Sequence, residues 1–551
     1  MNKKRLFRFK VVYAVFVGLF LVLSLRIAYL QIYRRDFFTQ LSERQHYGLF
    51  QIKAKRGRIL SRNKDVLAES LNFYSVFADP FFINDKARYA KILSQELGVP
   101  RERLLSRLKM KGRRFVWVKR KINWHEKKQL EKLNLSGIGF IREDQRFYPE
   151  AGLFSSLLGL VDIDNNGIEG IELYYDHYLR GKQGWVRAMR DGTSQRLVLT
   201  PLLTRLQEGA DLILTLDTRI QYWSDKYLRE QVEEFQAKKG SVVVMDAASG
   251  DILALANYNG TKESGRGDNR LNFSRNDAAI EMFEPGSVFK VVALVAAIAE
   301  GEVPESIYCE DGRFRIPGSV LRDWRPYGEL SFEEVFHKSS NIGVAKIVES
   351  MGRDKFYEYL RKFGLGERTG IDFPGEIRGS LRPAEQWSRT STYIIPIGQE
   401  IGVNLLQLAR IFAVIANGGN LVAPRLAEAV CRQATCKGFD SKKENIFSES
   451  VVNKARDILI GAVEQGTGER AAVEGEVIGG KTGTAQKFDL ELGRYSPDRY
   501  RANFAGFILS TSRPVVIAVT IDEPKVSHFG GVVAAPLFQK IAEKIVVYDV
   551  E

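Results

Sequence analysis

The residues from Val11 to Leu25, VVYAVFVGLFLVLSL, carry no charge, and this apolar stretch constrains the fold of the chain more than any other feature. About 15 residues form roughly 22 Å of helix, slightly less than the hydrocarbon core of a bilayer. Arg26 can extend its charged end toward the headgroups, while Ile27 to Leu30 complete the span. The stretch therefore predicts one helix that crosses a membrane.

A cleaved signal peptide is the alternative interpretation, because its apolar core has a similar length. No small-x-small cleavage motif follows the stretch, and the next residues are SLRIAYLQIYRR, so we expect an uncleaved anchor over residues 11–32. By the positive-inside rule, the basic residues before the anchor place a tail of residues 1–10 in the cytoplasm; they are Lys3, Lys4, Arg5, Arg8 and Lys10. No later stretch is long and apolar enough to return, so the chain from about residue 33 onward is expected outside.

The composition is that of a globular protein with several domains. The chain has 551 residues, of which 44% are hydrophobic and 27% charged, and its formal net charge is +14. Such a charge raises the question of nucleic acid, but the basic residues are scattered and no zinc or RNA-binding signature is present. We therefore expect a basic surface that faces anionic lipid or polymer, and no nucleic acid partner.

Three cysteines are too few for a disulfide framework. Cys431 and Cys436, in VCRQATCKG, can bridge only if the chain turns between them, because residues i and i+5 of a helix lie too far apart. The sequence leaves a disulfide and two free thiols both open, and no further ligands cluster nearby for zinc.

Residues 33–210 are predicted to form a mixed, charge-rich α+β domain that precedes a second domain over 211–551. Within it, Asp162-x-Asp164-x-Asn166-Gly167 imitates the start of a calcium loop. An EF-hand needs a bidentate glutamate at position 12, where this chain has Leu173. A tight turn rich in Asn and Gly is therefore the better explanation.

Residues 211–551 have the pattern of an antiparallel sheet flanked by helices. GSVVVMDAASGDILALANY (240–258) predicts two strands joined by a turn, and residues 300–470 are expected to be mostly helices and loops. Three more strands are predicted in VIGGKTGTAQ (477–486), ANFAGFIL (502–509) and PVVIAVTID (514–522), and AAPLFQKIAEKIV (534–546) predicts a terminal helix. Strands from both ends of one domain, with helices inserted between them, favour a single sheet.

Ser-x-x-Lys occurs three times, as Ser61/Lys64, Ser106/Lys109 and Ser287/Lys290. Only the third pair, in FEPGSVFK, opens an apolar helix that we expect to be buried. At i and i+3 the two side chains can share a face, and a buried lysine loses its charge readily enough to act as a base toward a serine. For an isolated pair, a capping serine and a snorkelling lysine would be the default interpretation.

Two further motifs follow in the same predicted domain. KSSNIG places Ser339 and Asn341 two residues apart, and GGKTGTA places Lys481, Thr482, Gly483 and Thr484 on a predicted strand. A glycine lets a ligand approach a strand closely, and a lysine with a threonine can bind a carboxylate. The order SxxK, SxN, KTG is the set of motifs of penicillin-recognising serine enzymes.

The whole chain resembles the class B penicillin-binding proteins, which are monofunctional D,D-transpeptidases of peptidoglycan. RGRILSRNKDVLA (56–68) resembles the family pattern RGxIxDRxGxxLA and departs from it at Ser61 and Lys64. The other matching segments are RFYP (146–149), GIEGIE (167–172), IGQEIGVNLLQLA (397–409) and FGGVVAAPLF (529–538). The motif EPGSVFK, with Glu284 before the proline, resembles the division-type branch of the family more than the elongation-type branch.

The resemblance implies an α/β (α+β) fold, with a transpeptidase domain like that of serine β-lactamases over 211–551. A non-catalytic pedestal domain over 33–210 and a single anchor in the inner membrane would precede it. It also implies a role for each motif residue. Ser287 would be the nucleophile, Lys290 its base, Ser339 a proton relay, and Asn341 a guide for Lys290 and the substrate amide. Lys481 and Thr482 would hold the substrate carboxylate beside Gly483, and the N–H groups of Ser287 and Thr484 would form the oxyanion hole.

The implied partners are peptidoglycan stem peptides ending in D-Ala-D-Ala, β-lactams, the membrane and a polytopic wall glycosyltransferase; no metal or organic cofactor is needed. A β-lactamase is the first rival function, and Glu385 in RPAEQW is its only candidate for activating water. An exposed loop carboxylate is the default interpretation of Glu385. A D,D-carboxypeptidase, a β-lactam sensor and a catalytically silent scaffold are further rival functions.

Overall fold

The structure is a computed structural model that describes residues 3–38, 47–110, 112–190, 197–204, 206–260, 276–489 and 493–550. The chain forms two compact units. One consists of residues 1–55 and 181–209, and the other of residues 56–180 and 210–551. Most of the predicted pedestal therefore belongs to the same compact unit as the predicted catalytic domain.

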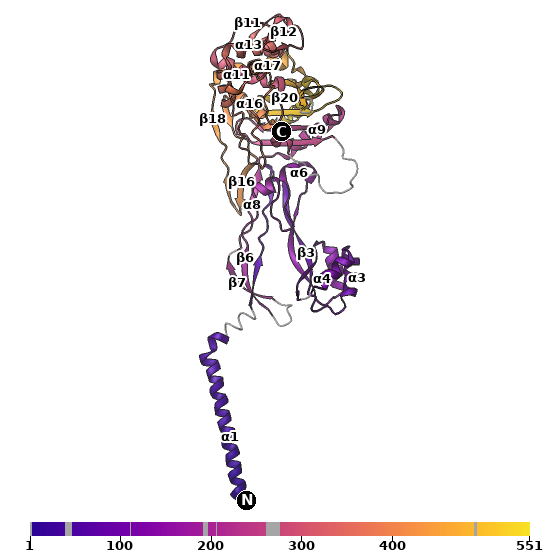
Figure 1. Cartoon of the computed structure of the whole chain (residues 1–551), viewed down its shortest axis with the longest axis vertical. Coiled ribbons are helices and arrows are strands. Elements are labelled where there is room, and N and C mark those ends of the chain that lie inside the picture. Colours follow the sequence, from indigo (N-terminus) through magenta and orange to yellow (C-terminus); the bar gives the residue numbers. More distant parts are fainter. Residues whose placement is uncertain are drawn as a thin grey trace. The chain divides into compact units, whose positions relative to one another are not determined.

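The first unit contains the N-terminal apolar helix and a small sheet (Figure 1). Helix α1 spans Lys3–Ala28 and continues as a π-helical turn, η1, over Tyr29–Tyr33. None of the residues of α1 is buried, and among the described residues this is the one helix long and apolar enough to cross a membrane. The prediction of one candidate membrane anchor is therefore confirmed.

The sheet of this unit has three antiparallel strands in the order β1-β6-β7. Strand β1 spans Tyr47–Ile52, β6 spans Gly184–Arg190 and β7 spans Leu197–Thr204.

The second unit begins with a seven-stranded sheet in the order β17-β16-β8-β2-β3-β4, in which β5 also pairs with β3. Its strands are β2 (Ile59–Leu60), β3 (Val66–Ala78), β4 (Val116–Ile122), β5 (Ile138–Phe147), β8 (Asp211–Leu214), β16 (Ala427–Arg432) and β17 (Thr435–Gly438). The sheet joins strands from before residue 211 to strands from well after it. This shared sheet explains why the two regions form one unit.

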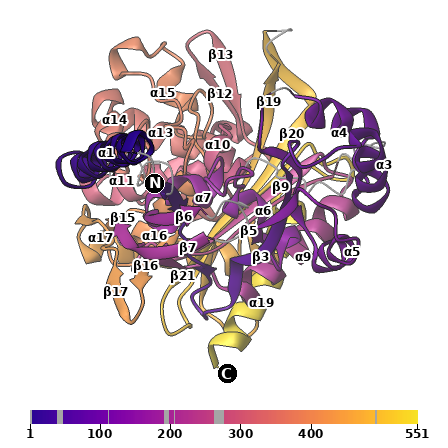
Figure 2. The same ribbon diagram turned by 90° about the horizontal axis from the view of Figure 1, so that it is seen from below.

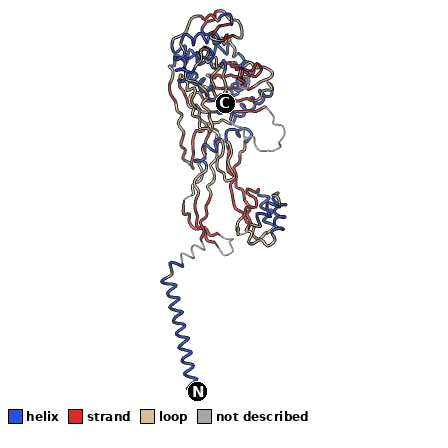
Figure 3. Tube along the Cα trace, in the orientation of Figure 1, coloured by secondary structure: helices blue, strands red, loops and turns tan. Residues whose placement is uncertain are grey.

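The far end of β3 carries a small helical subdomain, which Figure 3 shows as a group of helices at the end of long strands. It consists of α3 (Lys86–Leu97), α4 (Arg101–Leu108) and α5 (Trp124–Lys132), and it has its own buried core, which includes Val76, Leu93, Leu104 and Leu130. At the near end of β3 lie α6 (Ala151–Leu158), α7 (Gly170–Tyr174) and α8 (Asp176–Leu179).

A buried carboxylate links the family-like segments of this region. Glu172 of GIEGIE is fully buried and accepts hydrogen bonds from Arg56 Nε at 2.7 Å and from Arg146 Nε at 2.6 Å. Arg56 lies in RGRIL and Arg146 in RFYP. A buried charge is tolerated when charged hydrogen bonds surround it, and removing one partner is costly. The three segments are therefore joined by one buried ionic cluster.

Residues 211–551, which we call the catalytic half, contain a five-stranded antiparallel sheet in the order β10-β9-β21-β20-β19. Its strands are β9 (Lys239–Asp246), β10 (Ile252–Asn259), β19 (Ile478–Asp489), β20 (Arg494–Ile508) and β21 (Val515–Asp522). All five coincide with predicted strands, although the hairpin of β19 and β20 extends further than the prediction. Strand β19 forms one edge of the sheet.

Both faces of the sheet are covered by helices, as Figure 2 shows. Val242 and Val244 of β9 pack toward α9 (Thr218–Glu234) and α19 (Ala535–Val550), and Val243 and Met245 pack toward α11 (Lys290–Glu300) and α16 (Leu405–Ala416). Alternate side chains of a strand point to opposite faces, so a strand that is apolar at every position is buried on both sides. The predicted antiparallel sheet flanked by helices is confirmed.

The inserted region between β10 and β19 contains more strands than the sequence predicted. Besides α11 and α16, its described helices are α10 (Asp277–Ile280), α12 (Phe332–His337), α13 (Asn341–Met351), α14 (Arg353–Lys362), α15 (Ser391–Ile394) and α17 (Glu449–Glu464). The described 3-10 turns are η2 (Gly286–Phe289), η3 (Glu310–Gly312), η4 (Ala384–Gln386) and η5 (Glu469–Ala471). Short antiparallel pairs join β11 (Ser306–Tyr308) to β14 (Glu329–Ser331), β12 (Arg313–Ile316) to β13 (Ser319–Arg322), and β15 (Asn420–Val422) to β18 (Lys443–Asn445). A short helix at Gly530–Val533, α18, precedes α19.

The structure decides the question of the two cysteines in favour of a bridge. Cys431 and Cys436 are directly opposite each other in the hairpin of β16 and β17, and they form a disulfide. Gln433, between the strands, has a φ of 55°, in the left-handed region that tight turns use. The turn that the bridge requires is therefore present.

The calcium-like segment is a turn. Asp162 Oδ1 accepts hydrogen bonds from the backbone N–H groups of Asp164 at 2.8 Å and of Asn166 at 2.9 Å. Its carboxylate therefore holds the backbone of its own loop, as the sequence interpretation proposed.

Candidate active site

The SxxK segment begins as a tight 3-10 turn and not as the regular helix that the sequence predicted. Ser287 lies in η2, and α11 begins only at Lys290. Gly286 has a φ of 63°, and its N–H donates to Gly398 O at 3.1 Å. A side chain on Gly398 would come within 2.2 Å of the carbonyl oxygen of Gly286, so both positions require glycine. The turn leaves Ser287 partly exposed above a buried helix.

Lys290 is fully buried, and its amine faces the SxN loop. Its Nζ donates to the carbonyl oxygen of Ser339 at 2.6 Å, to Asn341 Oδ1 at 2.7 Å and to Ser339 Oγ at 3.2 Å. Within the described part of the chain, it makes no hydrogen bond to Ser287. Burial lowers the pKa of Lys290 to about 7, and the charge of Asp323 opposes that decrease. At neutral pH a large share of this amine is therefore unprotonated, as a general base must be.

The SxN loop is itself held by a carboxylate. Ser339 has a φ of 59°, an uncommon backbone conformation for a serine. Asp323 accepts hydrogen bonds from the backbone N–H groups of Asn341 and Ile342 and, at 2.6 Å, from the hydroxyl of Ser340. These groups form the N-terminus of α13, where the backbone donors have no partner within the helix. Asp323 therefore fixes the loop that contacts Lys290.

The KTG motif lies on a strand, β19, as predicted, and this strand forms an edge of the sheet. Lys481 is almost fully buried, and among the described residues its Nζ makes only long hydrogen bonds, to Thr467 Oγ1 at 3.4 Å, to the carbonyl oxygen of Thr482 at 3.4 Å and to Thr482 Oγ1 at 3.5 Å. Burial lowers the pKa of Lys481 well below its usual value, and the charge of Lys290 lowers it further. An anion beside Lys481 would offset the electrostatic repulsion between these two buried amines.

Glycine brings this strand against the serine turn. A side chain on Gly483 would lie 2.8 Å from the carbonyl oxygen of Pro285 and 3.0 Å from the N of Val288. The next residue, Thr484, is fixed because its Oγ1 accepts a hydrogen bond from Gly530 N at 3.0 Å. The structure thus brings together all three motifs: the turn with Ser287, the loop with Ser339 and Asn341, and the strand from Lys481 to Thr484.

Comparison with known proteins agrees with this arrangement. Residues 240–543 match the family model of the penicillin binding protein transpeptidase domain, and residues 51–214 match that of the penicillin-binding protein dimerisation domain. The probable peptidoglycan D,D-transpeptidase PenA of Neisseria gonorrhoeae is 34% identical over 95% of this chain and 89% of its own length. The chain belongs to the class B penicillin-binding proteins.

Other members of this family are similar over most of their length. The peptidoglycan D,D-transpeptidase FtsI of Escherichia coli is 30% identical over 94% of this chain and 87% of its own. Among solved structures, penicillin binding protein 3 of Mycobacterium tuberculosis, complexed with aztreonam, has a TM-score of 0.70 and 28% identity over 91% of this chain and 97% of that one. The mixed α/β fold of this penicillin-binding protein is therefore that of its family.

The sequence interpretation missed several residues of this penicillin-binding protein that hold the site together. Asp323 is one of them, because a lone aspartate in LRDW belongs to no recognisable motif. Asn503 of β20 is another: it is fully buried, and its Nδ2 donates to the carbonyl oxygen of Pro285 at 3.0 Å. Thr467 shares a hydrogen bond of 2.9 Å with Thr482. For Asn503, the one signal in the sequence was its place inside the apolar strand ANFAGFIL, where a buried polar side chain must have a hydrogen-bond partner.

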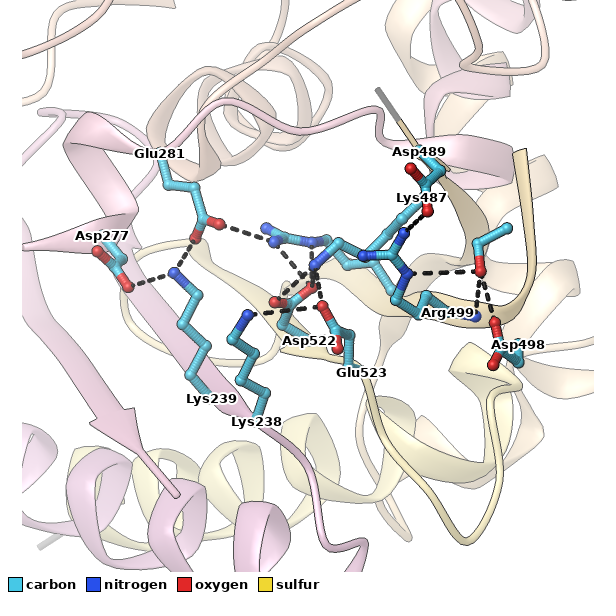
Figure 4. A network of polar contacts seen from close by, with 12 residues as sticks. Lys238, Lys239, Asp277, Glu281, Lys487, Asp489, Asp498, Arg499, Asp522 and Glu523 are labelled. Carbon is cyan, nitrogen blue, oxygen red and sulfur yellow. Dashed lines mark hydrogen bonds and ion pairs between the residues drawn. The ribbon is translucent and has the colours of Figure 1, made fainter. Parts of the chain in front are cut away.

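An ionic network anchors the segment before Ser287 to the sheet (Figure 4). Arg501 donates to Glu281 Oε1 at 2.8 Å and to Asp522 Oδ1 at 2.9 Å, and Lys239 contacts Glu281 Oε2 at 3.0 Å. Glu281 lies six residues before Ser287. Because Arg501 and Asp522 are almost fully buried, these ion pairs fix the approach to the serine turn more firmly than surface pairs would.

The other candidate motifs have structural roles in this penicillin-binding protein. Ser61 closes a turn with Asp65, whose N–H donates to Ser61 Oγ at 3.0 Å. Ser106 donates to the carbonyl oxygen of Arg103 at 2.9 Å on its own helix. Glu385 is exposed in the turn η4, in agreement with the default interpretation of this residue.

Proposed function

We propose that this chain is a peptidoglycan D,D-transpeptidase that cross-links stem peptides through an acyl-enzyme on Ser287. The observation that carries the proposal is the environment of Lys290. A fully buried amine with a pKa of about 7 contacts Ser339 and Asn341 and lies on the helix that the serine turn begins. Perturbed lysines of this kind are typical of sites in which an amine removes a proton from a nucleophile.

In the first half-reaction, Ser287 Oγ attacks the carbonyl carbon between the two terminal D-alanines, and its proton passes to Lys290 Nζ. The backbone N–H groups of Ser287 and Thr484 are proposed to stabilise the oxyanion. The C–N bond then breaks as Ser339 gives its hydroxyl proton to the nitrogen of the departing D-alanine and takes the proton held by Lys290 Nζ, and the acyl group remains on Ser287. Asn341 orients the amine of Lys290 and the amide of the substrate.

In the second half-reaction, an amine of a neighbouring stem peptide attacks the ester and loses its proton to the same relay. The new amide is the cross-link, and Ser287 regains its hydrogen. A β-lactam would acylate Ser287 in the same way, by opening its ring.

Lys481 and Thr482 are proposed to bind the terminal carboxylate of the substrate, and Gly483 lets that substrate approach the strand. This step also couples binding to the base. A carboxylate beside Lys481 favours its charged form, and a charged Lys481 disfavours a second charge on the buried Lys290. Substrate binding would therefore leave Lys290 unprotonated when Ser287 must be deprotonated.

The proposed location is the inner membrane, with residues 1–10 in the cytoplasm, residues 11–32 as the anchor, a pedestal over 33–210 and the transpeptidase domain over 211–551 outside. The basic residues in the first turns of α1 support this orientation, as does the Cys431–Cys436 disulfide, because disulfides persist in oxidising compartments. A role in septal wall synthesis is supported by the form of EPGSVFK and by the similarity to FtsI. A polytopic wall glycosyltransferase is the proposed protein partner.

Labelling with a fluorescent penicillin, followed by mapping of the adduct, tests the enzymatic proposal. We expect one adduct, on Ser287, that persists for many minutes and is lost in Ser287→Ala. Ser61→Ala and Ser106→Ala are matched controls, because each removes the serine of another Ser-x-x-Lys pair, and both should label normally. Rapid turnover of penicillin would indicate a β-lactamase instead.

Product analysis with pentapeptide-bearing glycan separates the transpeptidase from a carboxypeptidase and a scaffold. Cross-linked dimer that forms in step with released D-alanine supports the transpeptidase. Released D-alanine without dimer would instead indicate a carboxypeptidase, and growth unaffected by Ser287→Ala would favour a scaffold.

A further inference from the structure

The helical subdomain at the end of β3 exposes a cluster of aromatic and basic side chains that the proposed chemistry does not use. We call this cluster the pedestal tip and define it by six residues: Phe81, Phe82, Lys109, Arg113, Arg114 and Phe115. The three phenylalanines are 74%, 43% and 42% exposed, respectively. The six residues come from two loops, 79–85 and 109–115. Lys111, in the second loop, lies outside the described residues.

The pedestal tip lies far from the catalytic half of its unit. The first residues of β3 pair with β2, which in turn pairs with β8, whereas its last residue, Ala78, pairs with Val116 and Ile138. With 13 residues, β3 extends over roughly 40 Å. Figures 1 and 3 show α3 and α4 at that end of the long strands. The tip therefore cannot contact a substrate at Ser287.

The two loops hold the aromatic side chains in a defined arrangement. Asp79 N donates to Gly137 O at 2.7 Å, and Phe82 N donates to Asp79 O at 3.2 Å, which closes the first loop. The guanidinium of Arg114 lies 5.1 Å from the ring centre of Phe81 and 5.5 Å from that of Phe82. Cation–π contacts of this kind stabilise an exposed pair of rings. The aromatic side chains are therefore presented by an ordered surface.

The three rings lie outside the buried core of the subdomain. Its core is complete beneath them, with Val76, Leu93, Leu104, Val116 and Leu130 at most 6% exposed. Contiguous exposed aromatic side chains are uncommon on soluble surfaces and mark sites of interaction. The exposure of three phenylalanines in two adjacent loops therefore indicates a surface that is covered in the cell.

The charges around the rings indicate which kind of surface binds the pedestal tip. Asp79 is paired with Arg114 at 3.3 Å, and Asp85 caps α3 by accepting from Arg88 N at 2.9 Å. Within the described chain, Lys109 and Arg113 form no ion pair. The surface therefore combines apolar rings with uncompensated cations. Interfacial membrane binding uses the same combination, because rings insert at the headgroup level and cations attract anionic lipid.

We propose that the pedestal tip docks on the surface of an anionic phospholipid bilayer. An anionic wall polymer would be attracted by the cations, but it offers no apolar layer in which the exposed rings could be buried. The same chain carries the candidate membrane anchor α1, so the tip would act at a high effective concentration near the bilayer and needs only weak intrinsic affinity. Docking would fix the tilt of the pedestal and so the height of the catalytic half above the membrane. This proposal is independent of the proposed reaction.

The test uses the full chain, reconstituted in vesicles of phosphatidylcholine with or without phosphatidylglycerol. Phe81→Cys carries an environment-sensitive fluorophore; the native cysteines do not interfere, because Cys309 is buried and the other two form the disulfide. Ser450→Cys, exposed at the start of α17, carries the control probe. We expect a blue shift of the Phe81 probe and quenching by lipid-borne nitroxides, both stronger with phosphatidylglycerol, and neither for the control.

Charge reversal at the two unpaired cations provides the second arm. Removing a cation near an anionic surface weakens partitioning about fivefold per residue, so Lys109→Glu with Arg113→Glu should abolish the quenching, and Arg113→Lys should retain it. Normal melting and normal penicillin labelling of these variants show that the fold and the active site are intact. A Phe81 probe that is as water-exposed as the control in both vesicles overturns the proposal. It is equally overturned if the shift appears only on adding wall polymer or another protein.

Discussion

Replacing Asp323 by asparagine should separate positioning of the SxN loop from the chemistry of Lys290. The carboxylate of Asp323 accepts from two backbone N–H groups, of Asn341 and Ile342, and from the hydroxyl of Ser340. Asparagine has the same shape but only one acceptor oxygen, and its NH2 group would face a donor. Hydrogen bonds to charged groups contribute about 1.5–3 kcal/mol each and neutral ones about 1 kcal/mol. At the low end of these ranges, two bonds weaken by about 0.5 kcal/mol each and the third, of about 1.5 kcal/mol, is lost, so the expected loss is about 2–3 kcal/mol in the free energy of unfolding.

The same substitution also changes the base. Asp323 raises the pKa of Lys290 against the larger effect of burial, which lowers it to about 7. Lys290 acts as a base only when unprotonated, so acylation should rise with pH through the pKa of Lys290. Removing the negative charge of Asp323 lowers that pKa, and the rising limb should move to lower pH. If the full loss of 2–3 kcal/mol falls on the transition state, the plateau rate drops by roughly 10²-fold.

The assay is the second-order rate of Ser287 acylation by a fluorescent penicillin, measured from acid to alkaline pH for the wild type and Asp323→Asn, with thermal melting in parallel. Asp311→Asn is the matched control, because Asp311 lies nearby in the chain and, among the described residues, its carboxylate accepts a hydrogen bond only from the exposed Tyr308. A lower plateau with an unmoved limb would mean that Asp323 acts on loop geometry alone. An unchanged limb together with an unchanged melting temperature would refute the reasoning.

Three further predictions follow from the same geometry. Lys481→Ala should slow acylation by penicillin about 10- to 100-fold, because the carboxylate of the β-lactam loses one charged hydrogen bond; an unaffected rate would assign that carboxylate to another group. Gly483→Ala places a methyl group 2.8 Å from the carbonyl oxygen of Pro285 and should slow acylation at least tenfold, at a cost in stability of about 1–3 kcal/mol, as measured by melting. Replacing both Cys431 and Cys436 by serine should lower the free energy of unfolding by about 2 kcal/mol and leave penicillin labelling intact, since the hairpin lies in the other sheet; lost labelling would contradict that separation.

The amino-acid sequence alone determined the features that depend on local pattern. The uncharged run from Val11 to Leu25 predicts the candidate anchor, because no other environment accepts such a helix with every side chain exposed. Strands β9 and β21 were predictable because both of their faces are buried and most of their side chains are apolar, whereas β19 and β20 also carry charged residues and extend beyond the predicted strands. The three motifs were recognisable because their residue types and order are those of penicillin-recognising serine enzymes.

Tertiary structure decided whatever depends on which distant segments meet. Lys290 was expected beside Ser287, three residues away, but its amine faces Ser339 and Asn341, about fifty residues later. Asp323 became a functional candidate only because the fold brings its carboxylate to the first N–H groups of α13. A carboxylate, an amine and a strand edge acquire their chemistry from burial and from neighbours, and both are properties of the packed chain that no local pattern encodes.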